Sequence, residues 1–322
     1  MMLCAHPKIH LTHEASFYLW ENGDSEPMSA YLRRYLDGMS FRWLRADPAP
    51  MLEGLSPVSP RRDFYTALMR TMAARYGKTR FGDKTPGHSA KLGRIFEDYP
   101  DARVVRIVRS PVAVVRSLNR MPWFPRSLVS GAVMVGQEEK QCAPFADRIH
   151  QIRLEDLLAD PEAVLRGVLE FIGEPWDDAV LDHVNHAPEP NDMPPMPWFQ
   201  RARGRAERSV PVAEDPTAVR LIEVLTRHAR RSQGYAPLAV SAEPSLLALI
   251  WRYLTELPGF FWGAWVFLRA LSSIASEGGT DSSVTRRRFR AINPSAWDAY
   301  PDFEMPRPPA LPEDWDEALP RG

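Results

Sequence analysis

The segment Arg103–Val108 (RVVRIV) and the residues just after it constrain the fold more than any other part of the chain. Its β-branched residues predict a buried strand, bounded by Pro100-Asp101 before it and by Pro111 after it. Ser110 stands where a helix N-cap is preferred, and Pro111 then occupies the first helical position. A buried strand that turns at once into a helix is typical of a βα unit. The sequence therefore predicts a parallel sheet with helices packed on it.

The neighbouring segments continue this alternation of helices and strands. Apolar spacing predicts helices over residues 64–76, 88–99, 161–172 and 217–231, and a second short strand at 151–154. The predicted fold class is α/β, an open parallel sheet flanked by helices. We expect a loop at Phe81-Gly82-Asp83-Lys84-Thr85-Pro86, between the first two of these helices.

The character of the chain changes near residue 240, where we place a boundary between domains 1–240 and 241–322. We expect a pair of aromatic helices around Trp251 and Trp262, followed by an extended acidic tail rich in proline. The longest uncharged piece, Leu257–Leu268, has 12 residues, fewer than the roughly 20 that span a bilayer. Packing on the core or against a second copy is expected here, with membrane-surface contact as the alternative. The expected location is cytoplasmic.

Composition excludes several classes of function. The formal net charge is −1, which argues against a dedicated nucleic-acid binder. Two cysteines, Cys4 and Cys142, are too few for a disulfide framework or a structural zinc site. The pairs His10/His13 and His183/His186 have i, i+3 spacing, but neither has a third metal ligand nearby in the sequence, so no metal is expected.

Four residues are candidates for anion binding or proton transfer. Arg109 ends the predicted strand and Ser117 lies on the following helix, where an arginine and a hydroxyl suit a phosphate. Lys84 offers a compact cation for a transferring phosphoryl or sulfuryl group, and a solvated loop in which Thr85 caps the next helix is the alternative from these residues alone. Glu14 is either a general base or a charge at a helix start. From spacing alone, a surface ion pair and a self-bonded helix serine remain alternatives for Arg109 and Ser117.

Taken together, these segments resemble the sulfotransferases that use 3′-phosphoadenosine 5′-phosphosulfate (PAPS), nearest to the tyrosylprotein and related bacterial group. The resemblance covers about residues 3 to 240. It is carried by four pieces in order: GDKTPGHSAKLGRIFEDYPDARVVRIVRSPVAVVRSL, RLEDLLADPEAVLRGVLEFIGEPW, AERS and QGYAP. It implies a P-loop-type sheet and transfer of a sulfuryl group from PAPS to a hydroxyl, with no metal.

The resemblance also implies roles for individual residues. It assigns Arg109 and Ser117 to the 3′-phosphate of the nucleotide, and Lys84 to the sulfuryl group in transfer. Glu14 matches the glutamate that takes the acceptor's proton. Arg208 and Ser209 are expected to approach the nucleotide. The chain departs from the family pattern at two single positions, where it has Ser110 in place of Asp and Leu154 in place of Tyr.

One departure affects the donor site directly. The family begins with a strand and a glycine-rich loop of the type PRSGTT, which holds the 5′-phosphosulfate. Here no glycine precedes Gly23, and MMLCAHPKIHLTHEASFY resembles the helix that follows that loop. The first strand is then missing from the centre of the sheet, which would expose apolar surface on its neighbours. Either the true start lies upstream, which we favour, or the chain is a degenerate relative.

The expected function is therefore that of a PAPS-dependent sulfotransferase acting on a hydroxyl of a protein tyrosine, sugar, lipid head group or small alcohol. A non-catalytic module that binds a nucleotide or a protein partner is the alternative. A P-loop kinase is disfavoured because the chain lacks a GxxxxGK[ST] loop. Nucleic acid is not an expected partner, whereas a second copy of the chain is compatible with the sequence.

Overall fold

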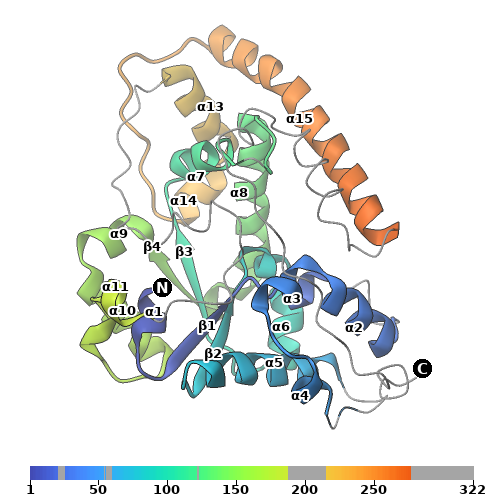
Figure 1. Ribbon diagram of the computed structural model, residues 1–322. Coiled ribbons are helices and arrows are strands. Elements are labelled where there is room, and N and C mark those ends of the chain that lie inside the picture. Colours follow the sequence, from blue (N-terminus) through green and yellow to red (C-terminus); the bar gives the residue numbers. More distant parts are fainter. Residues whose placement is uncertain (21–25, 54, 56–59, 122, 188–214, 277–322) are drawn as a thin grey trace.

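The computed structural model describes residues 1–322 apart from 21–25, 54, 56–59, 122, 188–214 and 277–322, and Figure 1 shows helices around short strands. The strands are β1 (Ile9–His13), β2 (Arg80–Lys84), β3 (Val104–Val108) and β4 (Ile149–Arg153). The helices before β3 are α1 (Met2–Ala5), α2 (Met28–Asp37), α3 (Met39–Leu44), α4 (Ala49–Leu52), α5 (Arg61–Arg75) and α6 (Leu92–Asp98). The helices after β3 are α7 (Pro111–Leu118), α8 (Leu128–Cys142), α9 (Leu154–Ala159), α10 (Pro161–Ile172), α11 (His183–His186), α13 (Pro216–Leu225), α14 (Arg227–Ser232) and α15 (Leu246–Ser276). Short 3₁₀ helices are η1 (Phe17–Trp20), η2 (Pro86–Lys91), η3 (Ala143–Arg148) and η4 (Asp178–Val180).

The four strands form two parallel pairs. Strand β1 pairs with β2, placing His13 opposite Lys84, and β3 pairs with β4, placing Val108 opposite Arg153. The predicted α/β class with parallel strands is confirmed. Within the described residues, however, no strand of one pair is hydrogen-bonded to a strand of the other, so the sheet is interrupted between the two pairs. Ile107 of β3 is 56% exposed, as expected for a strand that lacks a neighbour.

The βα unit that dominates the sequence pattern is confirmed. Helix α7 follows β3 directly, with Ser110 as its N-cap and Pro111 as its first residue. The predicted helix over 161–172 is α10. The side chain of Asp160 accepts a hydrogen bond from the N–H of Ala163, and the helix ends at Gly173 with φ +77°. Glycine adopts this left-handed conformation without steric cost, which explains the sharp end of the helix.

Two expectations for the strands were wrong. The predicted loop at 81–86 is mostly strand β2, which pairs with β1 and is poor in β-branched residues. A Cβ atom at Gly82 would lie 2.6 Å from Leu11 Cδ2, so glycine allows the two strands to approach. The N-terminal segment that resembled a helix instead contains β1, and only Met2–Ala5 and Phe17–Trp20 are helical. Pairing with a distant strand overrode the local pattern in both places.

Three helix expectations also need correction. The segment predicted as a helix over 88–99 begins as the 3₁₀ helix η2 and becomes α6 at Leu92. The segment 217–231 is divided into α13 and α14 at Thr226, whose hydroxyl bonds back to the carbonyl of Ile222 at 2.7 Å. The expected helix pair near the C-terminus is one helix, α15, which continues through Pro258.

Helix α15 packs against α8 and α13 along one side, and it runs along the outside of the molecule in Figure 1. Trp251 and Trp262 are 71% and 51% exposed, so the expectation that this aromatic segment packs on the core is wrong for these side chains. In the described part of the chain no helix is long and apolar enough to cross a membrane. The predicted boundary near residue 240 stays a prediction.

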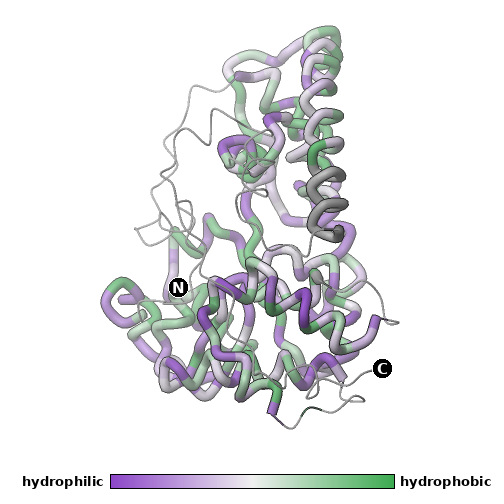
Figure 2. Tube along the Cα trace, turned by 45° about the vertical axis from the view of Figure 1, so that its right-hand side comes forward, coloured by the Kyte–Doolittle hydropathy of each residue, from purple (hydrophilic) through white to green (hydrophobic). Residues whose placement is uncertain are grey.

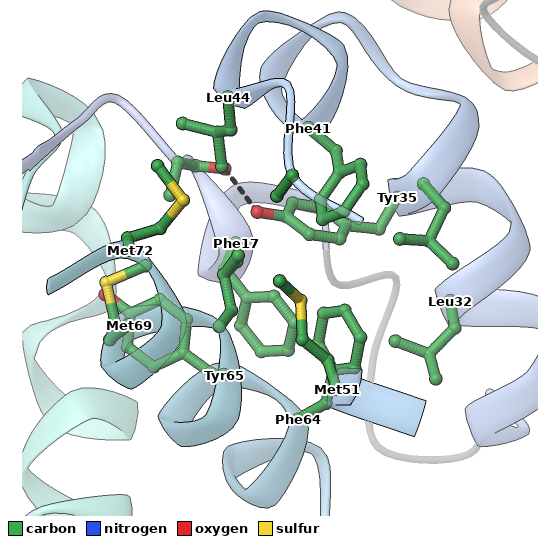
Figure 3. Close-up of a cluster of buried hydrophobic side chains, with 14 of the residues drawn as sticks. Phe17, Leu32, Tyr35, Phe41, Leu44, Met51, Phe64, Tyr65, Met69 and Met72 are labelled. Carbon is green, nitrogen blue, oxygen red and sulfur yellow. Dashed lines mark hydrogen bonds between the residues drawn. The ribbon is translucent and has the colours of Figure 1, made fainter. Parts of the chain in front are cut away.

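Apolar clusters pack around the strands and between the helices. The largest joins η1 to α2, α3 and α5 through buried aromatic rings, of which Phe17 and Tyr35 are labelled in Figure 3. A second lies between α7, α8 and α13. A third packs Ile9 of β1 against Leu165 and Leu169 of α10 and thereby connects the two strand pairs.

Candidate active site

The carboxyl ends of β1 and β2 bring Glu14 and Lys84 together. Glu14 follows the last residue of β1, and Lys84 is the last residue of β2. The Lys84 Nζ atom lies 2.7 Å from Glu14 Oε1, with side-chain exposures of 46% and 20% respectively. Residues 70 positions apart in the sequence thus form one ion pair at a solvent-facing strand edge. Ligands of open α/β sheets bind at this edge.

The backbone around Glu14 adopts an uncommon conformation. Glu14 and Ser16 have φ values of +51° and +54°, a region that costs a residue with a side chain about 1–2 kcal/mol. Two hydrogen bonds hold this turn to the end of β2. The N–H of Glu14 donates to the carbonyl of Lys84 at 3.0 Å, and the N–H of Ser16 donates to Thr85 Oγ1 at 3.1 Å. Such strain often marks a functional site, because only surrounding structure maintains it.

Buried aromatic side chains hold the other side of the same turn. Trp43 Nε1 donates to the carbonyl of residue 13 at 3.3 Å, Tyr35 Oη to that of residue 15 at 3.0 Å, and Tyr31 Oη to that of residue 17 at 2.7 Å. The two tyrosines are 0% exposed and the tryptophan is 6% exposed. The aromatic cluster of Figure 3 therefore positions the peptide that carries Glu14. Sequence reasoning missed these donors.

Beneath the ion pair lies a buried carboxyl group, Asp83. It accepts hydrogen bonds from Tyr65 Oη at 3.0 Å and from Thr85 Oγ1 at 2.8 Å, and His88 Nε2 lies 3.8 Å from it. Burial raises the pKa of Asp83, against the opposing effects of His88 and of these hydrogen bonds. Burial likewise lowers the pKa of His88. Because Thr85 also receives the N–H of Ser16, Asp83 acts as a positioning residue for the Glu14 turn.

The other predicted pair lies on the β3–α7 unit. Arg109 follows β3 directly, and Ser117 is near the end of α7; both are half-buried. Neither side chain makes a hydrogen bond or an ion pair with another described residue. Both remain accessible to a ligand, and their joint contact with one phosphate stays a prediction. Arg208 and Ser209 lie outside the described residues.

Glu155 connects the β3–α7 turn to β4, and sequence reasoning missed it. Its carboxylate accepts the N–H of Ser110 at 3.0 Å and the hydroxyl of Tyr235 at 2.6 Å. The Arg153 guanidinium lies 4.2 Å from the centre of the Tyr235 ring. Burial alone would raise the pKa of Glu155, but the hydrogen bonds from Tyr235 and Ser110 outweigh it and the pKa is lowered. Glu155 lies in the motif RLEDLL and Tyr235 in QGYAP. The spacing of these motifs alone did not predict that the two side chains meet.

This arrangement predicts a specific pH dependence for Glu155→Gln. Because the folded protein lowers the pKa of Glu155, its ionised form stabilises the fold above the ordinary value of 4.5, and this stabilisation is lost as pH falls through the lowered value. We expect Glu155→Gln to reduce the free energy of unfolding by about 1–2 kcal/mol at pH 7. Denaturant titrations of both proteins should show this difference shrinking as pH is lowered. A difference that is constant with pH would contradict the assignment, and Asp156→Asn, next in sequence and 59% exposed, is the control.

Among the residues that the structure describes, no group of three or more His, Cys, Asp or Glu side chains is arranged to hold a metal ion. His10 of the first histidine pair stacks on Tyr76 with ring centres 4.6 Å apart. His186 of the second pair lies 3.2 Å from Asp182. The observed Glu14–Lys84 pair places a carboxylate beside an ammonium group, a combination that suits proton transfer and anion binding.

Comparison with known proteins gives three similarities. The sulfotransferase family model matches residues 1–178. A protein-tyrosine sulfotransferase of Drosophila melanogaster is 27% identical over 115 residues, covering 32% of this chain and 23% of the relative. The chain thus matches less than a quarter of that relative's length. A solved sulfotransferase domain from the Synechococcus PCC 7002 olefin synthase is similar over 73% of this chain and 88% of that domain, at 19% identity and a TM-score of 0.46.

Proposed function

The chain belongs to the sulfotransferase family, and from that premise we propose that it transfers a sulfuryl group from PAPS to a hydroxyl acceptor. The observation that carries the proposal is the Glu14–Lys84 pair at the carboxyl ends of β1 and β2. A carboxylate and an ammonium side by side supply a proton acceptor and a positive charge at one place. Both are needed when a hydroxyl attacks an anionic donor.

In the proposed reaction the acceptor oxygen forms a bond to sulfur while the bond between sulfur and the 5′-phosphate oxygen breaks. Glu14 takes the proton of the acceptor hydroxyl. Lys84 compensates the negative charge that grows on the departing oxygen, and adenosine 3′,5′-bisphosphate leaves. The two side chains bond to each other at 2.7 Å, so substrate binding has to separate them. Their separation would make the carboxylate available to the acceptor only when the donor is bound.

The donor's 3′-phosphate is assigned to Arg109 and Ser117, and Arg208 and Ser209 are proposed to approach the same nucleotide. Support comes from the position of Arg109 directly after β3, beside the N-terminus of α7. Unpaired N–H groups at a helix start attract anions, and a guanidinium binds a phosphate with two parallel hydrogen bonds. The residues present fit these parts of the donor. No glycine precedes Gly23, so the segment before Glu14 holds no glycine-rich loop for the 5′-phosphosulfate.

The interruption of the sheet suggests where such a loop belongs. Strands β2 and β3 each have one described partner, and Ile107 of β3 is exposed. We infer that one more parallel strand lies between β2 and β3 in the active protein and carries the loop that binds the 5′-phosphosulfate. The alternative is a non-catalytic relative that binds the nucleotide or a partner without transferring sulfate.

The experiment that tests this function compares the 322-residue chain with a product extended by any codons that lie upstream and in frame. We expect the extended product to bind adenosine 3′,5′-bisphosphate in isothermal titration and to transfer labelled sulfate from PAPS to a tyrosine peptide or another hydroxyl acceptor. A stop codon directly upstream, or nucleotide binding without transfer to any of the acceptor classes, would favour the non-catalytic relative. No nucleotide binding by either product would contradict the donor assignment itself.

The acceptor class is proposed more broadly than the donor. The similarity to a protein-tyrosine sulfotransferase favours a protein tyrosine, while a sugar, a lipid head group or a small alcohol would need the same donor site. Acceptor specificity is usually set by loops, which vary among proteins that share a scaffold. The acceptor panel in the experiment above therefore contains one representative of each class.

Arg109→Ala should act mainly on donor binding. The Arg109 side chain makes no ion pair with another described residue, so its removal has little effect on stability. Loss of a charge-assisted contact to a phosphate costs about 1.5–3 kcal/mol, which corresponds to roughly a 10–100-fold rise in KM for PAPS. We expect kcat to change much less, as measured in steady-state kinetics with varied PAPS. Equal changes in kcat and KM would contradict this role, and Arg116→Ala on the following helix is the control.

A further inference from the structure

The outward face of α15 is apolar from Leu246 to Trp265. The side chains on this face expose between 37% and 79% of their surface. They recur at helical spacing and so lie along one side of the helix. They are Leu246, Leu247, Ile250, Trp251, Tyr253, Leu254, Phe261, Trp262 and Trp265. Figure 2 shows hydrophobic stretches along this helix at the edge of the molecule. We call this surface the α15 outer face.

The charged residues of the same stretch point in the opposite direction, toward the protein. Arg252 lies 3.4 Å from Asp215 and 3.1 Å from Glu256. The carboxylate of Glu256 accepts the N–H of Leu128 at 2.7 Å, and its backbone carbonyl accepts the hydroxyl of Ser127 at 3.2 Å. These contacts fix the rotation of the helix about its axis. The apolar face is therefore held outward by the fold.

Close packing of glycines on the inner side supports this orientation. A Cβ atom at Gly259 would lie 2.9 Å from the backbone oxygen of Arg126, and one at Gly263 would lie 2.3 Å from side-chain atoms of Pro125. The helix cannot turn its aromatic residues inward without losing this approach. Five exposed aromatic side chains, each with about 150–250 Å² of surface when fully accessible, make the patch larger than the few hundred Å² usual for soluble monomers.

The width of the outer face indicates what covers it. Leu247, Trp251, Leu254, Phe261 and Trp265 alternate in steps of four and three residues around Pro258, which resembles a coiled-coil seam. A coiled-coil partner requires a narrow seam with charged residues beside it. Here the flanking positions hold apolar residues, Ile250 and Trp262 among them, and proline occupies a seam position. The face is thus broader and less polar than a paired helix needs.

A lipid surface fits this face better. Tryptophan and tyrosine concentrate where hydrocarbon meets water, because their rings are apolar and their N–H or O–H groups are polar. The outer face contains three tryptophans and one tyrosine. The sequence beyond the helix also contains a basic cluster, RRRFR at 286–290, of the kind that attracts anionic lipids. The protein body supplies the hydrophilic side that an isolated interfacial helix would need for itself.

We propose that the α15 outer face binds the surface of a lipid bilayer, with α15 lying in the plane of the membrane interface. This mode needs no membrane-spanning segment. It also holds the carboxyl ends of β1–β4 at a fixed height relative to the membrane, since α15 packs on α8 and α13 and α8 packs on α7. The proposal does not depend on the sulfuryl-transfer chemistry, because it rests on residues outside that site.

The test is flotation of the purified full chain with phosphatidylcholine vesicles, with and without added phosphatidylglycerol. We expect the protein to float with both and more strongly with the anionic vesicles, with a blue shift of tryptophan fluorescence and quenching by brominated lipid. The double variant Trp251→Glu/Leu254→Glu should partition at least about tenfold less. Val184→Glu, a charge introduced at a side chain on α11 that is 60% exposed, should float like the unchanged protein.

Three results would overturn the proposal. The first is an unchanged protein that stays in the aqueous fraction with both kinds of vesicle. The second is flotation with anionic vesicles alone that the double variant does not alter, since the basic cluster would then explain it. The third is a dimer in sedimentation equilibrium that the double variant dissociates without any flotation, which would assign the face to a second copy. Quenching by brominated lipid uses the unchanged protein and so gives a result even if the variant misfolds.

Discussion

Replacing Lys84 with alanine is expected to lower kcat for sulfuryl transfer by about 10²–10³-fold, the usual effect of removing one group that stabilises transition-state charge. Lys84 ends β2 beside Glu14, where it compensates charge in the proposed reaction. KM for PAPS should change little, because the charge that Lys84 meets develops during transfer. Stability should also change by no more than about 1 kcal/mol, since exposed ion pairs contribute little.

Steady-state kinetics on the form of the protein that transfers sulfate would measure this effect. Lys84→Arg keeps the charge but not the compact shape, so it should restore part of kcat. Lys91→Ala, on η2, is the matched control and should leave both constants within a factor of about two of the original. A variant at Lys84 that raised KM and left kcat unchanged would place the residue in donor binding and remove it from the chemical step.

Phe17→Ala is expected to reduce the free energy of unfolding by about 3–5 kcal/mol. Phe17 is 0% exposed and lies at the centre of the aromatic cluster in Figure 3. Its ring centre is 5.0 Å from those of Tyr31 and Tyr65 and 5.1 Å from that of Tyr35. Alanine would leave a cavity that these rings cannot fill without moving.

Urea titration of the variant gives the change directly. Leu19→Ala, two residues further along the same 3₁₀ helix and 41% exposed, should cost less than about 1 kcal/mol. Tyr31 and Tyr35 also donate hydrogen bonds to the turn around Glu14. Phe17→Ala should therefore lower kcat even under conditions in which the variant is fully folded. A loss of stability as small as that of Leu19→Ala would contradict the central packing role of the ring.

Local signals predicted the β3–α7 unit and α10 because each has strong boundaries of its own. Pro111 is favoured at a helix start, Asp160 caps α10 with its side chain, and Gly173 ends it in the left-handed conformation. These preferences act over one turn of chain, so they are visible without tertiary information. The same applies to α5, where Phe64, Leu68 and Met72 form one buried face.

Strand β2 could not be predicted from its own residues. RFGDK contains a glycine and three charged residues, and only pairing with β1 makes it a strand. The prediction of two helices in place of α15 was wrong for a different reason. A proline inside a helix normally interrupts it. Here Pro258 lies on the exposed side of α15, and the opposite side of the helix is held by packing on α8 and α13.

The candidate site was predicted in part. Glu14 and Lys84 were both expected, and the register of β1 and β2 brings them together. The groups that position them were not expected, because Asp83, Tyr35 and Glu155 act through tertiary hydrogen bonds. Arg106 is a similar case. It stands in the strand predicted as buried, and its guanidinium lies 3.0 Å from buried Glu139 of α8. The sequence gives no sign of which distant carboxylate a buried arginine meets.

The break between the two strand pairs has a consequence for how ligands change the motions of the molecule. In the described residues no strand hydrogen bond joins the two halves, and Ile9 connects them through apolar contacts with Leu165 and Leu169. A donor nucleotide bound by Lys84 on one half and Arg109 on the other would act as a removable cross-link. Binding of the nucleotide would then restrict rotation of the two strand pairs relative to each other and raise the melting temperature of the protein. Hydrogen exchange on either side of the break should slow together when the nucleotide binds.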